Sequence, residues 1–159
     1  MRSSAVSYLY QMVTNRIFLS GFFSWFVAQL IKAVIDVLHV QRKSSRELAH
    51  TLFWRTGGMP SSHSSTVVAL TTSIGFTVGV DSPVFLLSLF YGGLVIRDSL
   101  GVRRASGIQS QVLNQLGKQL AEKEGIDYEM VKEVHGHSPA EVSVGILLGF
   151  SIGIAFSLL

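Results

Sequence analysis

Three short polar stretches of the sequence combine residue types that can bind an anion or move a proton, and each borders an apolar segment. They read TGGMPSSHSST at 56–66, RDSLGVRRASG at 97–107 and HGHSPAEVSVG at 135–145. Imidazoles act as bases, acids or nucleophiles near neutral pH, and guanidinium groups bind phosphate oxygens in pairs. These residue types together favour the binding of an anion such as phosphate.

The stretch at 56–66 predicts a helix start that is suited to an anion. Pro60 is tolerated in the first turn of a helix, and the two glycines allow unusual dihedral angles and the close approach of a ligand. The unpaired N–H groups of a helix N-terminus favour phosphate, and His63 in the first turn would point at the same anion. A serine-capped membrane helix with an incidental histidine explains the same residues, so both interpretations stay open.

A pair of arginines marks the stretch at 97–107. Arg103 and Arg104 could fork onto phosphate oxygens, and Asp98 could hold one of the two guanidinium groups in place. The alternative is a basic cluster at the membrane edge that only sets the orientation of the chain.

The stretch at 135–145 has a structural and a catalytic interpretation. Ser138, Pro139 and Glu141 fit an N-cap, a first-turn proline and the glutamate of a capping box. His137 stands just before the cap, one helical turn from Glu141, and a carboxylate beside an imidazole fixes its tautomer and raises its basicity.

A polar stripe interrupts the first apolar segment. Its residues follow each other at helical spacing and share one face, and they are Gln29, Lys32, Asp36 and His39. Charges at membrane depth are costly and usually face a cavity or the interior of a bundle. The stripe therefore lines a site, unless Lys32 and Asp36 only neutralise each other or Lys32 extends to the headgroups.

The composition indicates a membrane protein with a single domain over residues 1–159. Of the 159 residues, 48% are apolar and only 14% are charged, whereas soluble domains carry about 25% charged residues. The mean hydropathy is +0.42. The absence of cysteine excludes disulfides and a cysteine nucleophile, and the net charge of +3 is more typical of membrane topology than of nucleic-acid binding.

Four apolar segments predict an all-α bundle of about four transmembrane helices. They are Ile17–Leu38, Ser64–Val80, Pro83–Ile96 and Glu141 to the C-terminus. A span needs about 20 residues, so the second is marginal and the third must borrow flanking residues. Gly145, Gly149 and Gly153 form one stripe of small residues, which leaves room for a homodimer.

Four spans would put the long connections 39–63 and 97–140 on one side of the membrane. These connections hold 10 of the 13 basic residues, so the positive-inside rule makes their side cytoplasmic. Within the second connection, residues 105–124 predict a helix with an apolar stripe, packed on the domain or lying at the cytoplasmic interface. The stripe consists of Ile108, Val112, Leu116 and Leu120.

Taken together, the three stretches resemble the type-2 phosphatidic acid phosphatase family, which shares its core with the vanadium haloperoxidases. PSSH at 60–63 resembles its Pro-Ser-Gly-His motif, and HSPAE at 137–141 resembles His-x-x-x-Asp. GVRR at 101–104 stands in for Ser-Arg. More closely, GGMPSSHS, DSLGVRRASGIQ and GHSPAEV resemble a divergent branch of small membrane proteins, over roughly residues 25–155.

The resemblance implies a membrane phosphatase that hydrolyses a lipid phosphate monoester or pyrophosphate through a phosphohistidine. His137 would be the nucleophile, Glu141 would hold its other nitrogen, and His63 would protonate the leaving group. The resemblance implies no metal and no cofactor, because cations and backbone N–H groups surround the phosphate. The phosphate-binding residues would be Lys32, Arg103, Arg104, Gly58, Ser61 and Ser62.

The same resemblance implies a multi-pass protein of the cell inner (plasma) membrane. Its active site would face the cytoplasm, with a phospholipid or prenyl phosphate as substrate among the membrane lipids and no nucleic acid as partner. The sequence departs from the family in two respects. It has no Arg-Pro pair, so Lys32 is the best stand-in for the family lysine and either Arg42 or Arg55 for its arginine. Arg104 also lies 33 positions before His137, which makes residues 105–136 an insertion within one motif.

Two other functions explain part of the pattern. A non-catalytic lipid-phosphate binding or transport protein would use the same cationic pocket without chemistry. A metal enzyme would use His63, His135 and His137 with Asp98 or Glu141, because His-x-His spacing can ligate a metal.

Overall fold

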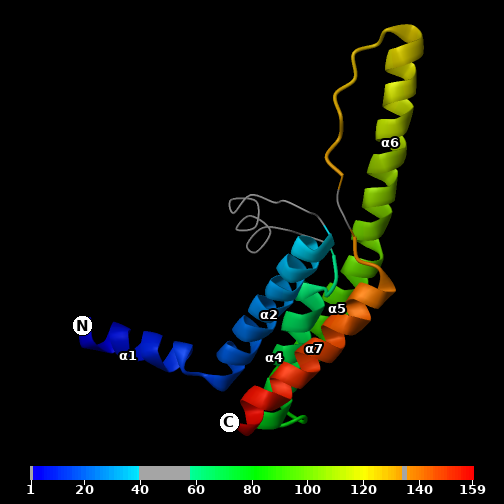
Figure 1. The fold of residues 1–159 in the computed structure, drawn as a ribbon. Helices are drawn as coiled ribbons and strands as arrows, with labels where there is room; N and C mark the ends of the chain where they lie inside the picture. The colour runs from blue at the N-terminus through cyan, green and yellow to red at the C-terminus, as the bar shows by residue number, and fades with distance from the viewer. Residues whose placement is uncertain (1, 40–57, 134–135) are drawn as a thin grey trace.

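The computed structural model describes residues 2–39, 58–133 and 136–159. These residues form helices and connections and include no strand. Figure 1 shows the helices in their order along the chain, which are α1 (Arg2–Val13), α2 (Arg16–His39), α4 (Ser62–Thr77), α5 (Pro83–Leu100), α6 (Val102–Glu124) and α7 (Pro139–Leu158). The prediction of an all-α fold is confirmed.

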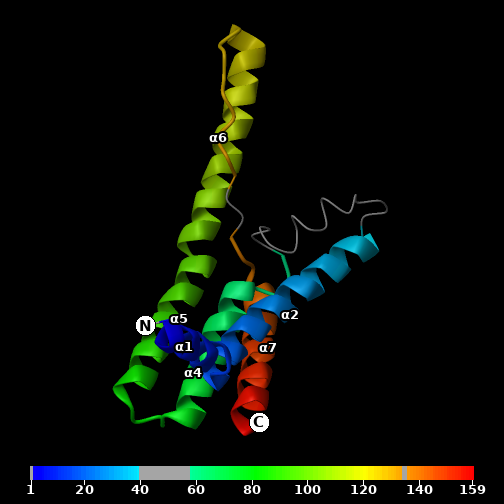
Figure 2. The ribbon, with the colours of Figure 1, turned by 90° about the vertical axis from the view of Figure 1, so that its left-hand side faces the viewer.

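Helix α4 is the centre of the bundle, and the other long apolar helices pack around it. It contacts α7 most extensively, then α2 and α5, whereas α5 and α7 barely touch each other. In Figures 1 and 2, α2 ends, α4 begins, α5 ends and α7 begins at the same end of the bundle. The C-terminus and the turn between α4 and α5 lie at the opposite end, as the four-segment topology predicts.

The contact between α4 and α7 depends on the stripe of glycines. A Cβ atom at Gly145 would come within 2.6 Å of the Ser61 carbonyl oxygen, and one at Gly149 would collide with the Ser65 backbone. Gly153 meets Ala69 and Thr72 in the same way. Only residues without a side chain allow two helix backbones to approach this closely. The stripe is therefore covered by α4 within one chain, and the proposed use of it by a second copy is wrong.

Small polar residues join α2 to α4. The Ser24 and Ser65 hydroxyls lie 2.5 Å apart, and the Ser20 hydroxyl faces the Ala69 carbonyl oxygen at 3.5 Å. All three serines are fully buried. In a medium without water, such hydroxyls need partners on neighbouring backbone or side chains, so these contacts favour one register of α2 on α4.

Three helical segments of the described chain are long and apolar enough to cross a membrane. They are Arg16–Leu38, the continuous segment Pro83–Glu124 and Pro139–Leu158. The third predicted segment borrows residues as expected, since α5 continues to Leu100. Helix α4 has 16 residues and a length of about 24 Å, which is shorter than the roughly 30 Å hydrocarbon core and agrees with its marginal prediction.

The helix predicted at 105–124 forms as α6, but it does not fold back onto the bundle. It leaves α5 at Gly101 and projects beyond the other helices (Figures 1 and 2). Residues 126–133 return along it, held by Asn114, whose side chain bonds the backbone of Val131 and the hydroxyl of Tyr128. The predicted apolar stripe lies on exposed positions, which are Ile108, Val112, Leu116 and Leu120.

Helix α1 was not predicted, because residues 1–16 are polar and mixed. It packs only on the start of α2, and its described side chains are exposed, including Tyr8, Leu9 and Tyr10. It contributes nothing to the core, so its apolar residues carry no periodic burial signal.

We expect Gly149→Ala to destabilise the protein, because its new methyl group would overlap the Ser65 backbone. Overpacking of this kind costs about 1–3 kcal/mol, which thermal unfolding in detergent, followed by tryptophan fluorescence, would detect as a lower midpoint. The matched control is Gly93→Ala on α5, where nothing lies within 4 Å of the new Cβ atom. Equal midpoints for the two variants would contradict this packing.

Candidate functional site

The starts of α4 and α7 are tied together at the end of the bundle where the polar stretches meet. The Ser61 N–H donates to the Glu141 carbonyl oxygen at 3.0 Å. This bond crosses from the N-cap of α4 to the first turn of α7. Two helix N-termini, each with unpaired N–H groups and a partial positive charge, therefore lie side by side.

The two histidines that begin these helices face the same space. The ring centroids of His63 and His137 are 6.5 Å apart, and the ring planes are tilted by 57°. His137 is buried, with only 5% of its surface exposed, whereas His63 keeps a larger exposed surface. One phosphoryl group could reach both rings, because attack distances are about 3–3.5 Å and hydrogen bonds about 2.6–3.2 Å.

His63 precedes the apolar part of α4, and its surroundings disfavour a positive charge. Partial burial lowers the pKa of the His63 imidazole below its ordinary value of 6.5, and the Arg103 guanidinium lowers it further. His137 and Lys32 act in the same direction, whereas Asp98 opposes them. The site is thus electropositive, and it draws charge from α2, α5, α6 and α7 together.

Glu141 holds His137 and the start of α7 with the same carboxylate. Its Oε2 atom lies 2.9 Å from His137 Nδ1 and accepts the Ser138 N–H at 3.2 Å. The Ser138 hydroxyl in turn accepts the Glu141 N–H, which completes the predicted capping box with Pro139 in the first turn. A proton on Nδ1 that faces the carboxylate leaves Nε2 as the free acceptor nitrogen, so the structural and catalytic interpretations use one geometry.

Lys32 brings a positive charge from α2 to the start of α4. Its side chain is 3% exposed, and its Nζ atom donates to the Ser62 hydroxyl at 3.2 Å. Gln29, one turn earlier, is also buried, and its Oε1 atom has no hydrogen-bond partner within the described part of the chain. Asp36 is half-buried, and the side chain of His39 lies outside the described residues. The predicted polar stripe therefore faces the bundle interior in its first half.

The 33 residues between Arg104 and His137 are closed in space by the α6 hairpin. The His137 N–H donates to the Ser99 carbonyl oxygen at 3.2 Å, and Gly136 packs against the Arg104 backbone. The insertion at 105–136 is thus a projection whose two ends meet at the site. Sequence patterns gave no sign of Ser99, because its contribution is a backbone carbonyl that any residue type provides.

The two arginines differ in their surroundings. Arg103 Nε lies 2.7 Å from Asp98 Oδ2, so the predicted Asp98 contact forms with this arginine, and both side chains are partly exposed. Its charge also acts on His63. The Arg104 side chain is exposed, and only its backbone touches the chain segment before His137.

The start of α4 differs in detail from the prediction. The helix begins at Ser62 with Ser61 as N-cap, so Pro60 precedes the helix and does not occupy its first turn. The Ser61 hydroxyl accepts the Ser64 N–H, and its own N–H is bonded to α7, so both groups already have protein partners. The N–H groups of Ser62 and His63 are those that a helix leaves without an intrahelical acceptor. Gly58 has φ = 82°, a left-handed conformation that favours glycine.

Within residues 2–39, 58–133 and 136–159, no group of three His, Cys, Asp or Glu side chains could hold a metal ion. His135, which the metal hypothesis requires, lies outside these ranges.

We expect Glu141→Gln to unfold at the same temperature as the parent, because glutamine also completes a capping box. Glu141→Ala removes the acceptor for the Ser138 N–H, and we expect it to lower the free energy of unfolding by about 1 kcal/mol, the usual cost of a lost cap. Thermal unfolding in detergent would compare the three proteins. An equal loss in both variants would show that the carboxylate charge, and not the cap, stabilises this end of α7.

Comparison with known proteins agrees with this arrangement of helices and polar stretches. Residues 13–152 match the model of the divergent PAP2 family. The chain is also 34% identical over 160 residues to the uncharacterized membrane protein YuiD of Bacillus subtilis (strain 168), across 92% of this chain and 97% of that protein. No solved structure matches the chain significantly. Because the matched residues include all three polar stretches and most of the bundle, this membrane protein belongs to the divergent PAP2 family.

Proposed function

We propose that this protein is a phosphatase that hydrolyses a lipid phosphate monoester or pyrophosphate through a phosphohistidine intermediate. The observation that carries the proposal is the pair of facing imidazoles, 6.5 Å apart, of which one is held by a carboxylate. In-line phosphoryl transfer needs a nucleophile on one side of phosphorus and a proton donor at the leaving oxygen on the other.

The residues divide the reaction into two steps. His137 Nε2 attacks phosphorus, and the bond from phosphorus to the lipid oxygen breaks while protonated His63 gives that oxygen its proton. Neutral His63 then accepts a proton from water, whose oxygen attacks the phosphohistidine and releases inorganic phosphate. Glu141 stabilises the positive charge that His137 carries between the two steps.

Charge neutralisation is the main demand of this reaction on the protein, because phosphoryl transfer spreads negative charge over the equatorial oxygens. Arg103 and Lys32 act on the same space as His63 and would bind two of these oxygens. Arg104 would reach the phosphate by a change of rotamer from its exposed position. The N–H groups of Ser62 and His63 would complete the cradle.

The substrate is a lipid because the site lies at the end of an apolar bundle. The two long connections at this end carry 10 of the 13 basic residues, which favours the cytoplasmic side of the plasma membrane. A phosphate bound there would lie at headgroup level, and its acyl or prenyl chain would remain in the bilayer among other lipids.

The proposal is tested with protein purified in detergent, by measuring phosphate release from phosphatidic acid, phosphatidylglycerophosphate and undecaprenyl pyrophosphate. We expect turnover of at least one of these lipids, and its loss in His137→Ala. A cation removed far from the site, in Lys118→Ala on α6, is the control that should leave turnover unchanged. Activity that survives His137→Ala would refute the nucleophile, and vanadate binding without any turnover would favour a lipid-phosphate binding protein instead.

We expect a distinct pH dependence, because His63 must be protonated to act as the acid and its pKa is lowered. The protonated fraction of His63 in the free enzyme falls as pH rises through a value below 6.5, so kcat/KM should decline over the same range. Ionisation of the substrate affects parent and variant alike, so His63→Asn should lack this decline at its lower rate. An identical profile in His63→Asn would exclude His63 as the acid.

A further inference from the structure

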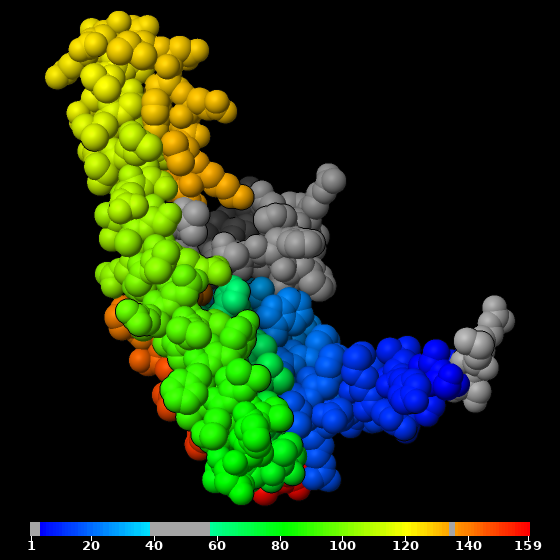
Figure 3. All heavy atoms as spheres, turned by 180° about the vertical axis from the view of Figure 1, so that it is seen from behind, coloured from blue at the N-terminus to red at the C-terminus, as the bar shows by residue number. Residues whose placement is uncertain are grey.

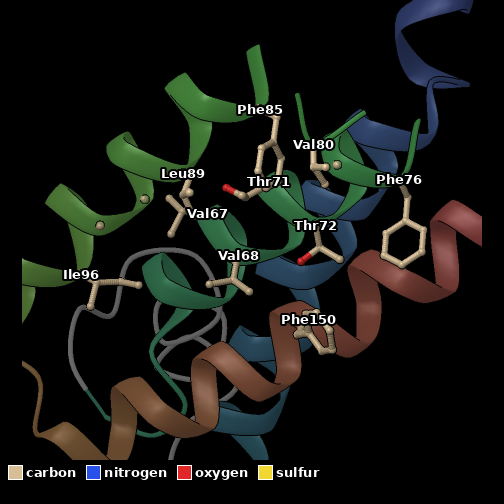
Figure 4. A pocket seen from close by; sticks show the side chains of 13 residues that line it. Val67, Val68, Thr71, Thr72, Phe76, Val80, Phe85, Leu89, Ile96 and Phe150 are labelled. Atoms are coloured by element: carbon tan, nitrogen blue, oxygen red, sulfur yellow. The ribbon is translucent and has the colours of Figure 1, made fainter. Parts of the chain in front are cut away.

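An apolar groove runs along the bundle between α4, α5 and α7. It has a volume of about 530 Å³, which lies in the usual range of roughly 300–1,000 Å³ for small-molecule sites. Figure 4 shows the side chains that line it, among them Val67 and Thr71 of α4, Leu89 and Ile96 of α5, and Phe150 of α7. The groove exists because α5 and α7 both pack on α4 but barely touch each other.

The walls of the groove have little to offer a polar ligand. Apart from the hydroxyls of Thr71 and Thr72, its side chains are aliphatic or aromatic. The Thr71 hydroxyl already donates to the Ser88 carbonyl oxygen at 3.2 Å. Leu89, Phe76 and Phe150 are each about half exposed, so the groove opens sideways toward the lipid that surrounds the bundle. Its chemistry therefore matches a hydrocarbon chain.

One end of the groove reaches the pair of histidines. Val67 lies four residues after His63, so it occupies the same face of α4 one turn below. Ile96 lies three residues before Ser99, whose carbonyl oxygen binds the His137 N–H. The groove thus begins about one helical turn, roughly 5.4 Å, from the phosphate position of the proposed reaction.

The length of the groove corresponds to one leaflet of a bilayer. Along α5, the lining residues extend from Phe85 to Ile96, about 17 Å at 1.5 Å per residue, and along α4 from Val67 to Phe76, about 14 Å. Half of a hydrocarbon core of about 30 Å is roughly 15 Å. A chain whose headgroup lies between the histidines would therefore end near the far end of the groove.

We propose that this groove holds one hydrocarbon chain of the lipid whose phosphate binds between His63 and His137, and this proposal rests on the proposed function. A chain that moves from the bilayer into the groove gains little hydrophobic energy, because lipid tails are as apolar as the walls. The groove instead orients the phosphate and selects chains by shape, which contributes to rate through positioning.

Gly93 determines how wide a chain the groove accepts. It lines the groove beside Gly92, and a Cβ atom at Gly93 would have nothing within 4 Å. At Gly92 the new atom would lie 3.7 Å from Val67, so that position is already filled on one side. A large side chain at residue 93 therefore fits without displacing a helix and occupies the space of the lipid chain.

The test combines photolabelling with turnover in detergent. A phosphatidic acid with a diazirine in one acyl chain is irradiated with the parent, Gly93→Trp and the control Leu94→Trp, whose position on α5 is exposed and outside the groove. We expect the parent and control to be labelled at groove residues, and unlabelled phosphatidic acid to compete. Gly93→Trp should lose this label, and its kcat/KM for dioleoyl phosphatidic acid should fall about tenfold or more, as misfit in an apolar pocket does. Vanadate, which has no chain, should bind all three proteins equally and shows that the variants fold.

The outcomes separate this proposal from the proposed function. Competed labelling of the groove without turnover of any lipid would support the groove and refute the phosphatase. Turnover with competed labels at Ile31 and Leu147, which line a smaller hollow of about 310 Å³ between α2 and α7, would refute the groove and leave the phosphatase intact. Unchanged turnover and labelling in Gly93→Trp would also overturn it.

Discussion

The close contact between the start of α4 and the start of α7 is the constraint on which the rest of the structure depends. Glycines at 145, 149 and 153 let the two backbones meet without intervening side chains, and the bond from the Ser61 N–H to the Glu141 carbonyl oxygen fixes their relative position at the site. Lipid offers no hydrophobic force between helices, so close packing and hydrogen bonds decide their register. One histidine on each helix, His63 and His137, is placed by this register.

The end of the bundle collects charge without placing it deep in the membrane. Lys32 lies on α2 near its C-terminal end and bonds Ser62, while Arg103 follows the end of α5 and is paired with Asp98. A lysine buried in a membrane bundle is expensive unless polar groups surround it, and the first turn of α4 provides them with its serines and unpaired N–H groups. The same concentration of positive charge disfavours a proton on His63 and prepares the site for an anion.

The α6 hairpin shows how a long insertion is accommodated inside one functional motif. The chain leaves the bundle after Gly101 and returns at Gly136, where it packs against the Arg104 backbone and meets the Ser99 carbonyl oxygen. The hairpin has its own internal contacts around Asn114, so it places no load on the bundle. Distance along the sequence therefore says little about distance at the site, because closing a longer loop costs only slightly more entropy.

The sequence by itself determined the helical class, the long apolar helices, the α6 helix and the capping box of α7, because periodicity, segment length and capping residues are local properties. It also singled out His63, His137, Glu141, Lys32 and Arg103, whose residue types and flanking turns indicate anion chemistry. Only the tertiary structure decided which neighbour covers the glycine stripe, that Ser61 joins two helices, that Ser99 meets His137, and that α5 and α7 leave a groove. These features depend on contacts between segments far apart in the chain, and any glycine stripe or backbone carbonyl looks the same in sequence whichever partner it meets.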